Sequence, residues 1–169
     1  GSYGCVFGQT LEDTFSLEGD MVGCDLTGIL DSEAEKERMA VLSYLFRRVE
    51  REIEDRRPTI IVIDEAWKAL DNAYFAERLS NWLVTARKQN TVAVMMTQYA
   101  SQLESTRTGE TIVEAVPTQI LLPNIRANAA DYELLNLYDK EIDVLLNTGS
   151  DSRLALSCDD QGSIVVYAE

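Results

Sequence analysis

Residues 60–65 read Ile-Ile-Val-Ile-Asp-Glu, and the remaining chain is best interpreted outward from this stretch. Four consecutive β-branched apolar residues are typical of a strand buried on both faces, as in the interior of a parallel sheet. Pro58 ends the element before it, and Asp64 and Glu65 follow where the strand would end. Open α/β sheets bind ligands at the carboxyl ends of their strands, so the two acids lie where a site is expected.

The acid pair by itself has two interpretations. One carboxylate can hold Mg²⁺ while the next polarises a water, as in the Walker B part of a nucleotide-hydrolysis site. Alternatively, both acids cap a short helix at residues 66–70, because Asp and Glu favour helix starts. The motif alone leaves both interpretations open.

Composition predicts one globular domain. The chain has 169 residues, 46% of them hydrophobic and 26% charged, which suffices for a sizeable core. Its apolar runs are too short to span a bilayer and no secretory leader is recognised, so we expect the chain to be soluble by itself. Gly1-Ser2 is interpreted as a tag remnant, and residues 3–169 as a single domain.

Charge and residue types exclude several classes of function. The net charge of −14 is opposite in sign to what neutralises phosphates, so direct nucleic-acid binding is disfavoured. Arginines between positions 47 and 57 alternate with acids, which favours a salt-bridged, solvated helix face over a basic patch. The absence of histidine excludes Ser-His-Asp and Cys-His catalysis. Cys5, Cys24 and Cys158 fit a reducing compartment and have no metal-ligand spacing.

The periodicity of apolar residues predicts a strand–helix–strand unit. A long amphipathic helix is expected over residues 33–56, opened by a capping box from Ser32 to Glu35. The strand over 59–63 is followed by a second amphipathic helix over 73–89, ended by Asn90. Another apolar run predicts an inner strand over 92–96, and such a unit forms a right-handed crossover.

The flanking segments carry weaker patterns. We expect short strands near 14–17 and 21–24, a loop over 99–109, and a third strand over 118–122 between two prolines. The other expected elements are short helices over 110–115, 131–137 and 140–146 and a closing hairpin of strands 153–157 and 164–167.

Polar side chains fall at the ends of three of these elements. Asp64 and Glu65 end one strand, Gln98 follows the next, and Arg87 and Lys88 end the helix between them. Each has an ordinary explanation, since loop amides are common and basic residues favour helix C-termini. Together they resemble the parts of a phosphoryl-transfer site, in which an acid holds Mg²⁺, a base and an amide orient water, and an arginine meets the γ-phosphate of a neighbouring subunit.

Six ordered stretches resemble the carboxyl-terminal ATPase domain of the large type IV secretion and conjugation ATPases, the TrbE/CagE-like family. The stretches are 25–31, 44–48, 63–67, 82–90, 97–98 and 117–124. The resemblance implies an α/β fold, a RecA-like P-loop NTPase core with a mostly parallel sheet, here lacking the Walker A strand and loop and carrying a C-terminal β-hairpin. It also implies a parent that hydrolyses ATP with Mg²⁺ to power pilus assembly and export of protein or DNA.

The same resemblance implies a setting and roles for residues. The parent would form a homo-oligomer, as a hexamer, at the cytoplasmic face of the bacterial inner membrane. It would meet other secretion subunits there and reach the membrane only through partners or other regions. Asp64 matches the acid that binds Mg²⁺ through water, and Glu65 the group that activates water and helps bind nucleotide. Gln98 matches the sensor amide, and Arg87 with Lys88 the basic pair that acts across a subunit interface.

One departure from the family pattern limits the expected activity. The family has a phosphate loop ending in Gly-Lys-Ser/Thr, and this chain contains no Gly-Lys dipeptide. Without those backbone N–H groups and that lysine, the triphosphate loses most of its cradle, so we expect this chain to bind Mg-ATP weakly or not at all and to hydrolyse none. The absent strand would lie between 92–97 and 118–122, and its loss would leave an open edge that pairs with another strand or a second copy.

Two alternatives to a motor remain open. One is a non-catalytic assembly or docking module of the secretion apparatus. The other is a DNA translocase or coupling protein of the same superfamily, which the acidic charge disfavours.

Overall fold

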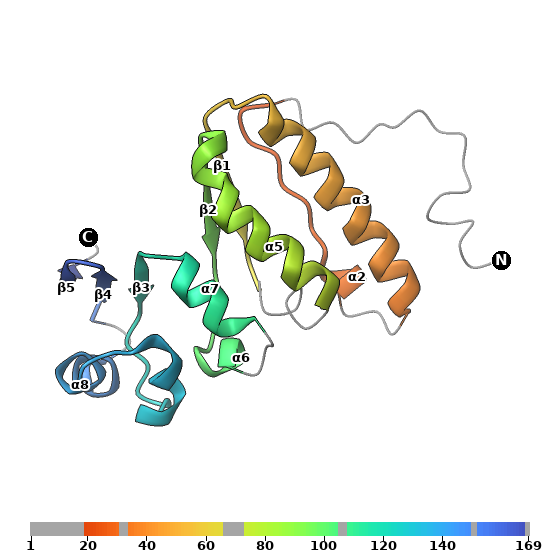
Figure 1. Ribbon diagram of the computed structural model, residues 1–169. Coiled ribbons are helices and arrows are strands. Elements are labelled where there is room, and N and C mark those ends of the chain that lie inside the picture. Colours follow the sequence, from red (N-terminus) through yellow and green to blue (C-terminus); the bar gives the residue numbers. More distant parts are fainter. Residues whose placement is uncertain (1–18, 31–33, 66–72, 105–107, 150–151, 168–169) are drawn as a thin grey trace, which may run out of the picture. The chain divides into compact units, whose positions relative to one another are not determined.

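The computed structural model describes residues 19–30, 34–65, 73–104, 108–149 and 152–167 (Figure 1). In chain order the elements are α2 (Thr27–Leu30), α3 (Glu35–Glu54), β1 (Thr59–Ile63), α5 (Ala73–Ala86), η1 (Arg87–Gln89), β2 (Thr91–Met95), α6 (Ser101–Glu104), α7 (Gly109–Ala115), β3 (Gln119–Leu121), η2 (Ala129–Leu135), α8 (Asp139–Asn147), β4 (Leu154–Asp159) and β5 (Gly162–Tyr167). The contacts divide the chain into a first unit, residues 1–61 with 86–92, and a second unit, residues 62–85 with 93–169.

Helix α3 is the main element of the first unit. It buries Leu42, Phe46 and Ile53, whose spacing of four and seven residues places them on one stripe of the helix. The helix starts at Glu35, slightly later than predicted, with Ala34 as the N-cap residue, while Ser32 of the expected capping box lies outside the described residues. The amphipathic helix predicted for this region is therefore confirmed.

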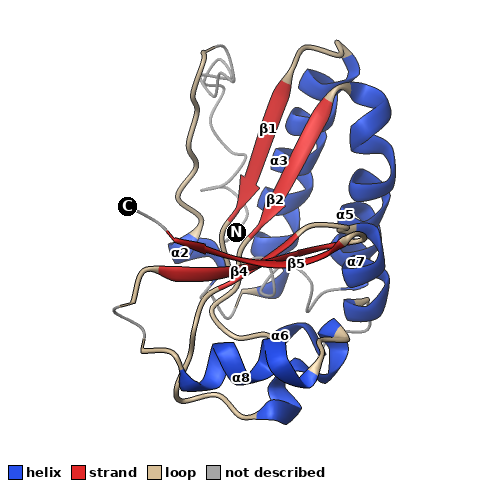
Figure 2. Ribbon diagram, turned by 90° about the vertical axis from the view of Figure 1, so that its left-hand side faces the viewer, coloured by secondary structure: helices blue, strands red, loops and turns tan. Residues whose placement is uncertain are grey.

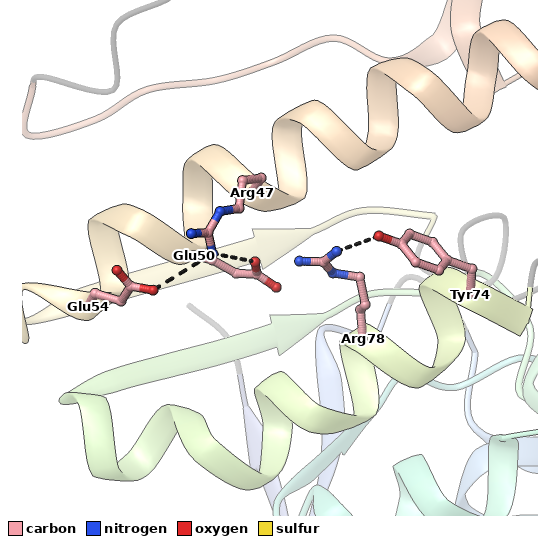
Figure 3. Close-up of polar contacts among 5 residues, drawn as sticks. All are labelled: Arg47, Glu50, Glu54, Tyr74 and Arg78. Atoms are coloured by element: carbon pink, nitrogen blue, oxygen red, sulfur yellow. Dashed lines mark hydrogen bonds and ion pairs between the residues drawn. The ribbon is translucent and has the colours of Figure 1, made fainter.

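The charged face of α3 forms ion pairs, as the alternating charges predict. The Arg47 guanidinium lies 3.6 Å from the Glu50 carboxylate and 3.8 Å from that of Glu54 (Figure 3). Beyond the helix end, Arg57 pairs with Glu52 at 3.0 Å. Exposed pairs of this kind contribute little to stability, about 0–1 kcal/mol each. Their main effect is that the glutamates neutralise the positive charge of the arginines in this segment.

Strands β1 and β2 form a parallel pair (Figure 2). At one end the backbone N–H of Thr59 donates to the carbonyl of Asn90 at 3.2 Å, and at the other the N–H of Met96 donates to the carbonyl of Ile63 at 2.9 Å. The partners advance in the same direction along both strands, which defines parallel pairing. The predicted strand–helix–strand unit is therefore present.

The prediction that these strands are buried on both faces is wrong. Exposed and partly covered residues alternate along β1, where Ile60 is 71% and Val62 is 56% exposed. The same alternation runs along β2, where Val92 is 59% and Val94 is 39% exposed. A run of apolar residues is fully buried only when other elements cover both sheet faces, and the described part of the chain covers one.

In the second unit, α5 carries a buried apolar stripe and α8 packs in a separate core. Phe75, Leu79 and Trp82 are buried along α5, and Tyr74 accepts a hydrogen bond from Arg78 on the same helix (Figure 3). The helix continues into η1 and ends at Asn90, whose φ of 57° is the predicted left-handed stop.

The separate core lies around η2, α8 and β4 and consists of Tyr132, Leu135, Leu145 and Leu156.

The C-terminal hairpin is present as predicted and recruits the third strand. β4 and β5 pair antiparallel, with Ser157 opposite Ile164. β3 pairs antiparallel with the other edge of β4, with Ile120 opposite Ser157, so the sheet order is β3-β4-β5. The α/β class, with a parallel sheet and a C-terminal antiparallel hairpin, is therefore confirmed, and β3 belongs to the hairpin's sheet.

Smaller elements differ from the predictions in several places. Residues 21–24 are exposed and form no strand, and the predicted loop over 99–109 contains α6. The helix expected over 131–137 is the 3₁₀ helix η2, which ends at Asn136 with a φ of 53°. The strand expected near 14–17 and the helix at 66–70 lie outside the described residues.

Candidate functional site

The acid pair follows β1 in a tight turn. The carboxylate Oδ1 of Asp64 accepts the backbone N–H of Glu65 at 2.9 Å. Glu65 itself has a φ of 52°, in the left-handed region that residues with a side chain rarely adopt. Strained residues of this kind occur at functional sites, where the surrounding structure holds them in one geometry, but Arg56 and Arg153 adopt the same conformation elsewhere in this chain.

The turn brings Glu65 to Gln98, which lies 33 residues later in the chain. The amide Nε2 of Gln98 donates to Oε1 of Glu65 at 2.5 Å. The Met96 to Ile63 hydrogen bond continues the β1–β2 pairing to this point, so both side chains follow the carboxyl ends of paired parallel strands. The hydroxyl of Thr97 donates to Oε1 of Gln102 at 2.6 Å, which ties the segment around Gln98 to α6. The site predicted from strand ends therefore has one direct acid–amide contact.

The basic pair precedes β2 in the chain, at the end opposite to Gln98. Arg87 and Lys88 belong to η1, before β2 begins, whereas Gln98 follows the strand's end. Lys88 is exposed, and the side chain of Arg87 lies outside what the structure describes. Five strand residues separate the two ends of β2, so the pair is not brought to the acids by this strand. A role across a subunit interface stays a prediction.

Asp64 is the candidate ligand for a magnesium ion. Its side chain is exposed, and only Oδ1 is engaged by a described residue, so Oδ2 can accept a hydrogen bond from a metal-bound water. Within the described ranges no group of three or more His, Cys, Asp or Glu side chains could hold a metal. One carboxylate acting through water fits Mg²⁺, which keeps several waters and takes its remaining ligands from substrate phosphates.

A surface hollow opens beside Gln98. It has a volume of about 330 Å³ and is lined by Gln98, Tyr99, Asn124, Ile125 and Arg126. Ile125 and Arg126 are not among the residues predicted from the sequence. The signal was Asn124, because an asparagine favours an Asx turn, which fixes the backbone of the residues that follow.

Known proteins that match this chain belong to related secretion and conjugation systems. The TraG P-loop domain family matches residues 39–158. The chain is 37% identical over 156 residues to the type IV secretion system protein virB4 of Bartonella quintana (strain Toulouse), which covers 91% of this chain and 20% of that protein. It is 33% identical over 115 residues to the conjugal transfer protein TrbE of Rhizobium radiobacter, covering 66% of this chain and 14% of the relative.

A solved structure agrees with the fold. The structure of VirB4 of Thermoanaerobacter pseudethanolicus aligns with a TM-score of 0.66 at 23% identity and covers 86% of this chain and 40% of that one. At this identity the match shows the fold alone. The chain spans a fifth or less of the length of these two curated relatives. The chain belongs to the TraG P-loop domain family, within the VirB4/TrbE group of type IV secretion proteins.

Proposed function

We propose that this chain supplies the Walker B part of the motor ATPase of a type IV secretion system, whose ATP hydrolysis powers pilus assembly and export of protein or DNA. The observation that carries the proposal is the hydrogen bond from Gln98 to Glu65 at the carboxyl ends of β1 and β2. A water-activating carboxylate needs a partner that fixes its orientation, and a side-chain amide can both donate to the carboxylate and accept from the water.

The chain's own residues have distinct tasks in this mechanism. Bound Mg-ATP supplies the γ-phosphoryl group and the charge-neutralising metal. Asp64, whose Oδ1 accepts the backbone N–H of Glu65, would hold the magnesium ion through water with its other oxygen, and the carboxylate of Glu65 would take the proton of the attacking water. Gln98 keeps that carboxylate in position. Arg87 and Lys88, at the other end of β2, serve a neighbouring copy in a homo-oligomer, which we propose is a hexamer.

The test measures ATP turnover in the full-length parent. Glu65→Gln keeps size and hydrogen bonding but removes the base, and we expect turnover to fall at least about 100-fold, the usual contribution of a general base. Glu77→Gln, an exposed glutamate on α5, is the matched control and should leave turnover unchanged. Turnover by Glu65→Gln equal to that of the control would remove Glu65 from its role.

A second candidate function is a docking module of the secretion apparatus. Exposed apolar side chains favour it, because Val62 and Val94 on the parallel pair and Ile164 and Val166 on β5 stay open to solvent in the described residues. In that case the catalytic residues would be bystanders, and the Glu65→Gln protein would retain its assembly with other secretion subunits as well as its turnover rate.

We place the parent at the cytoplasmic face of the bacterial inner membrane, together with other type IV secretion subunits. No described helix combines the length and apolar character needed to cross a bilayer. Membrane association would therefore come from partners or from regions other than these helices.

A further inference from the structure

The turn that carries Arg126 is held firmly. The backbone N–H of Asn124 donates to the carbonyl of Leu145 at 2.9 Å, and Leu145 is fully buried in α8. The N–H of Ala127 donates to the carbonyl of Asn124 at 3.1 Å, and the side-chain Oδ1 of Asn124 accepts the N–H of Arg126 at 3.0 Å. Three hydrogen bonds thus fix the backbone at Arg126, while its side chain is exposed.

Arg126 is an unusual cation in this chain. The sequence has 29 acidic and 15 basic residues, and described arginines such as Arg47 and Arg57 form ion pairs. The guanidinium of Arg126 has no ion pair or hydrogen bond with any residue that the structure describes, and only its backbone is engaged. It lines the same hollow as Gln98, whose amide contacts Glu65.

The lining of this hollow suits an anion. Its polar side chains offer N–H and O–H donors, and none of its lining residues carries a carboxylate. Oδ1 of Asn124 already accepts a hydrogen bond, and Nδ2 of the same side chain remains a donor. The second hollow of the same unit, about 570 Å³, has the opposite character, because four of its lining residues are glutamates: Glu104, Glu110, Glu114 and Glu133. A polyanion would therefore be repelled from the second hollow and accepted by the first.

We propose that Arg126, with the side-chain amide of Asn124, forms a phosphate-oxygen subsite beside the Glu65–Gln98 pair. The guanidinium fork matches two phosphate oxygens, and the fixed turn reduces the entropy lost on binding. The inference rests on the proposed function, in which the ligand is the phosphate chain of a nucleotide or the phosphate that hydrolysis releases.

The experiment titrates the 169-residue chain with sodium tripolyphosphate and, separately, with orthophosphate, against sodium chloride of equal ionic strength. Nitrogen-detected NMR follows the Arg126 Nε–H and the Gln98 side-chain amide. We expect saturable shifts of both signals with at least one phosphate probe and none with chloride. Stronger binding of tripolyphosphate would identify the nucleotide's phosphate chain, and stronger binding of orthophosphate would identify released phosphate.

Arg126→Ala should weaken phosphate binding about fivefold or more, the loss expected for one charge-assisted contact at a partly exposed site. Arg51→Ala removes the same charge from the exposed face of α3 and should bind like the unchanged chain. Arg126→Lys, which keeps the charge but loses the fork, should lie between them. Equal affinity in Arg126→Ala and Arg51→Ala would overturn the subsite, as would shifts caused by adenosine and not by either phosphate.

These outcomes are independent of the turnover test. Normal turnover by Glu65→Gln in the full-length parent would end the proposed function even if Arg126 binds phosphate. If Glu65→Gln loses ATP turnover but Arg126→Ala binds phosphate with unchanged affinity, only the subsite proposal fails.

Discussion

Glu65 combines a strained backbone with a carboxylate that belongs to the proposed site. Its left-handed backbone costs about 1–2 kcal/mol relative to ordinary angles, and a glycine there would avoid the cost. The carboxylate that the turn presents is engaged by Gln98, an exposed contact that adds little stability by itself. If Glu65 has its proposed role, the glutamate at this position is therefore kept for the site at the expense of folding free energy.

The strain at Glu65 is testable by stability measurements. Glu65→Gly and Glu65→Ala both lose the Gln98 contact, but only Gly relieves the left-handed φ, so we expect the Gly variant to unfold with a free energy about 1 kcal/mol higher. The measurement is urea unfolding followed by circular dichroism.

Glu77, exposed within α5, supplies the control pair for this comparison. There the order should reverse, because Gly in a helix interior is about 1 kcal/mol less favourable than Ala. The same order at both positions would refute the strain at Glu65.

Cys158 carries a second effect at the scale of a residue. Burial, followed by the charges of Glu141 and Asp159, raises the pKa of its thiol above the ordinary value. A raised pKa means less thiolate at a given pH, and thiolate is the reactive form. We expect the iodoacetamide labelling rate of Cys158 to keep rising at pH values where a small-molecule thiol has levelled off, with mass spectrometry resolving the labelled cysteines.

Cys24 provides the internal comparison. It is exposed, so access alone should make it label faster than the partly buried Cys158 at neutral pH. Labelling of Cys158 as fast as Cys24 at neutral pH would contradict the shielding of this thiol.

At the scale of elements, the parallel pair has open edges and one open apolar face in the described part of the chain. Within the described ranges β1 and β2 pair only with each other, and Val62 and Val94 both have open faces. Unpaired strand edges and apolar faces promote association with other strands. The pair that positions Glu65 and Gln98 is thus also a surface open to self-association.

We predict that the chain self-associates through this pair. Val62→Lys with Val94→Lys should lower the weight-average mass measured by sedimentation velocity, since charge on an exposed strand blocks strand pairing. Val84→Lys, which charges an exposed valine on α5, should leave the mass unchanged. A chain that sediments as a monomer at every concentration would exclude the prediction.

At the scale of the whole molecule, nucleotide affinity depends on a phosphate cradle. The contacts proposed for the described residues are Asp64 for the metal, the Glu65–Gln98 pair and the hollow lined by Arg126, and the sequence has no Gly-Lys dipeptide. Backbone N–H groups and the loop lysine supply most of the triphosphate's contacts in P-loop proteins.

Calorimetric titration of this chain with Mg-ATP should therefore show binding weaker than about 100 μM and no hydrolysis, because the loop contacts are missing. The full-length parent, measured in the same buffer, is the positive control. Micromolar affinity of the chain itself would show that a P-loop cradle is not required here.

The net charge sets the remaining prediction for the whole molecule. With a net charge of −14 and ion pairs along α3, the chain should not retard duplex DNA in a gel even at about 50 mM salt, where phosphate contacts are strongest. Retardation that weakens steeply with added salt would instead favour the DNA-translocase alternative.

The sequence by itself determined the local elements and the chemistry at their ends. The spacing of Leu42, Phe46 and Ile53 predicts α3, and apolar runs predict β1 and β2, because helical and strand periodicities are local properties. The acids at 64 and 65 and the amide at 98 were placed at strand ends for the same reason. The ordered motifs also suffice to indicate the family, since they depend on residue types and spacing alone.

Only the tertiary structure decided which elements meet. It joined β3 to β4, left alternate residues of β1 exposed, and tied Asn124 to α8 so that Arg126 lies beside Gln98. None of these follows from local pattern, because backbone hydrogen-bonding groups are alike on every strand and the free energy of a pairing depends on residues distant in sequence. The left-handed Glu65 likewise depends on its surroundings, since local preference opposes it.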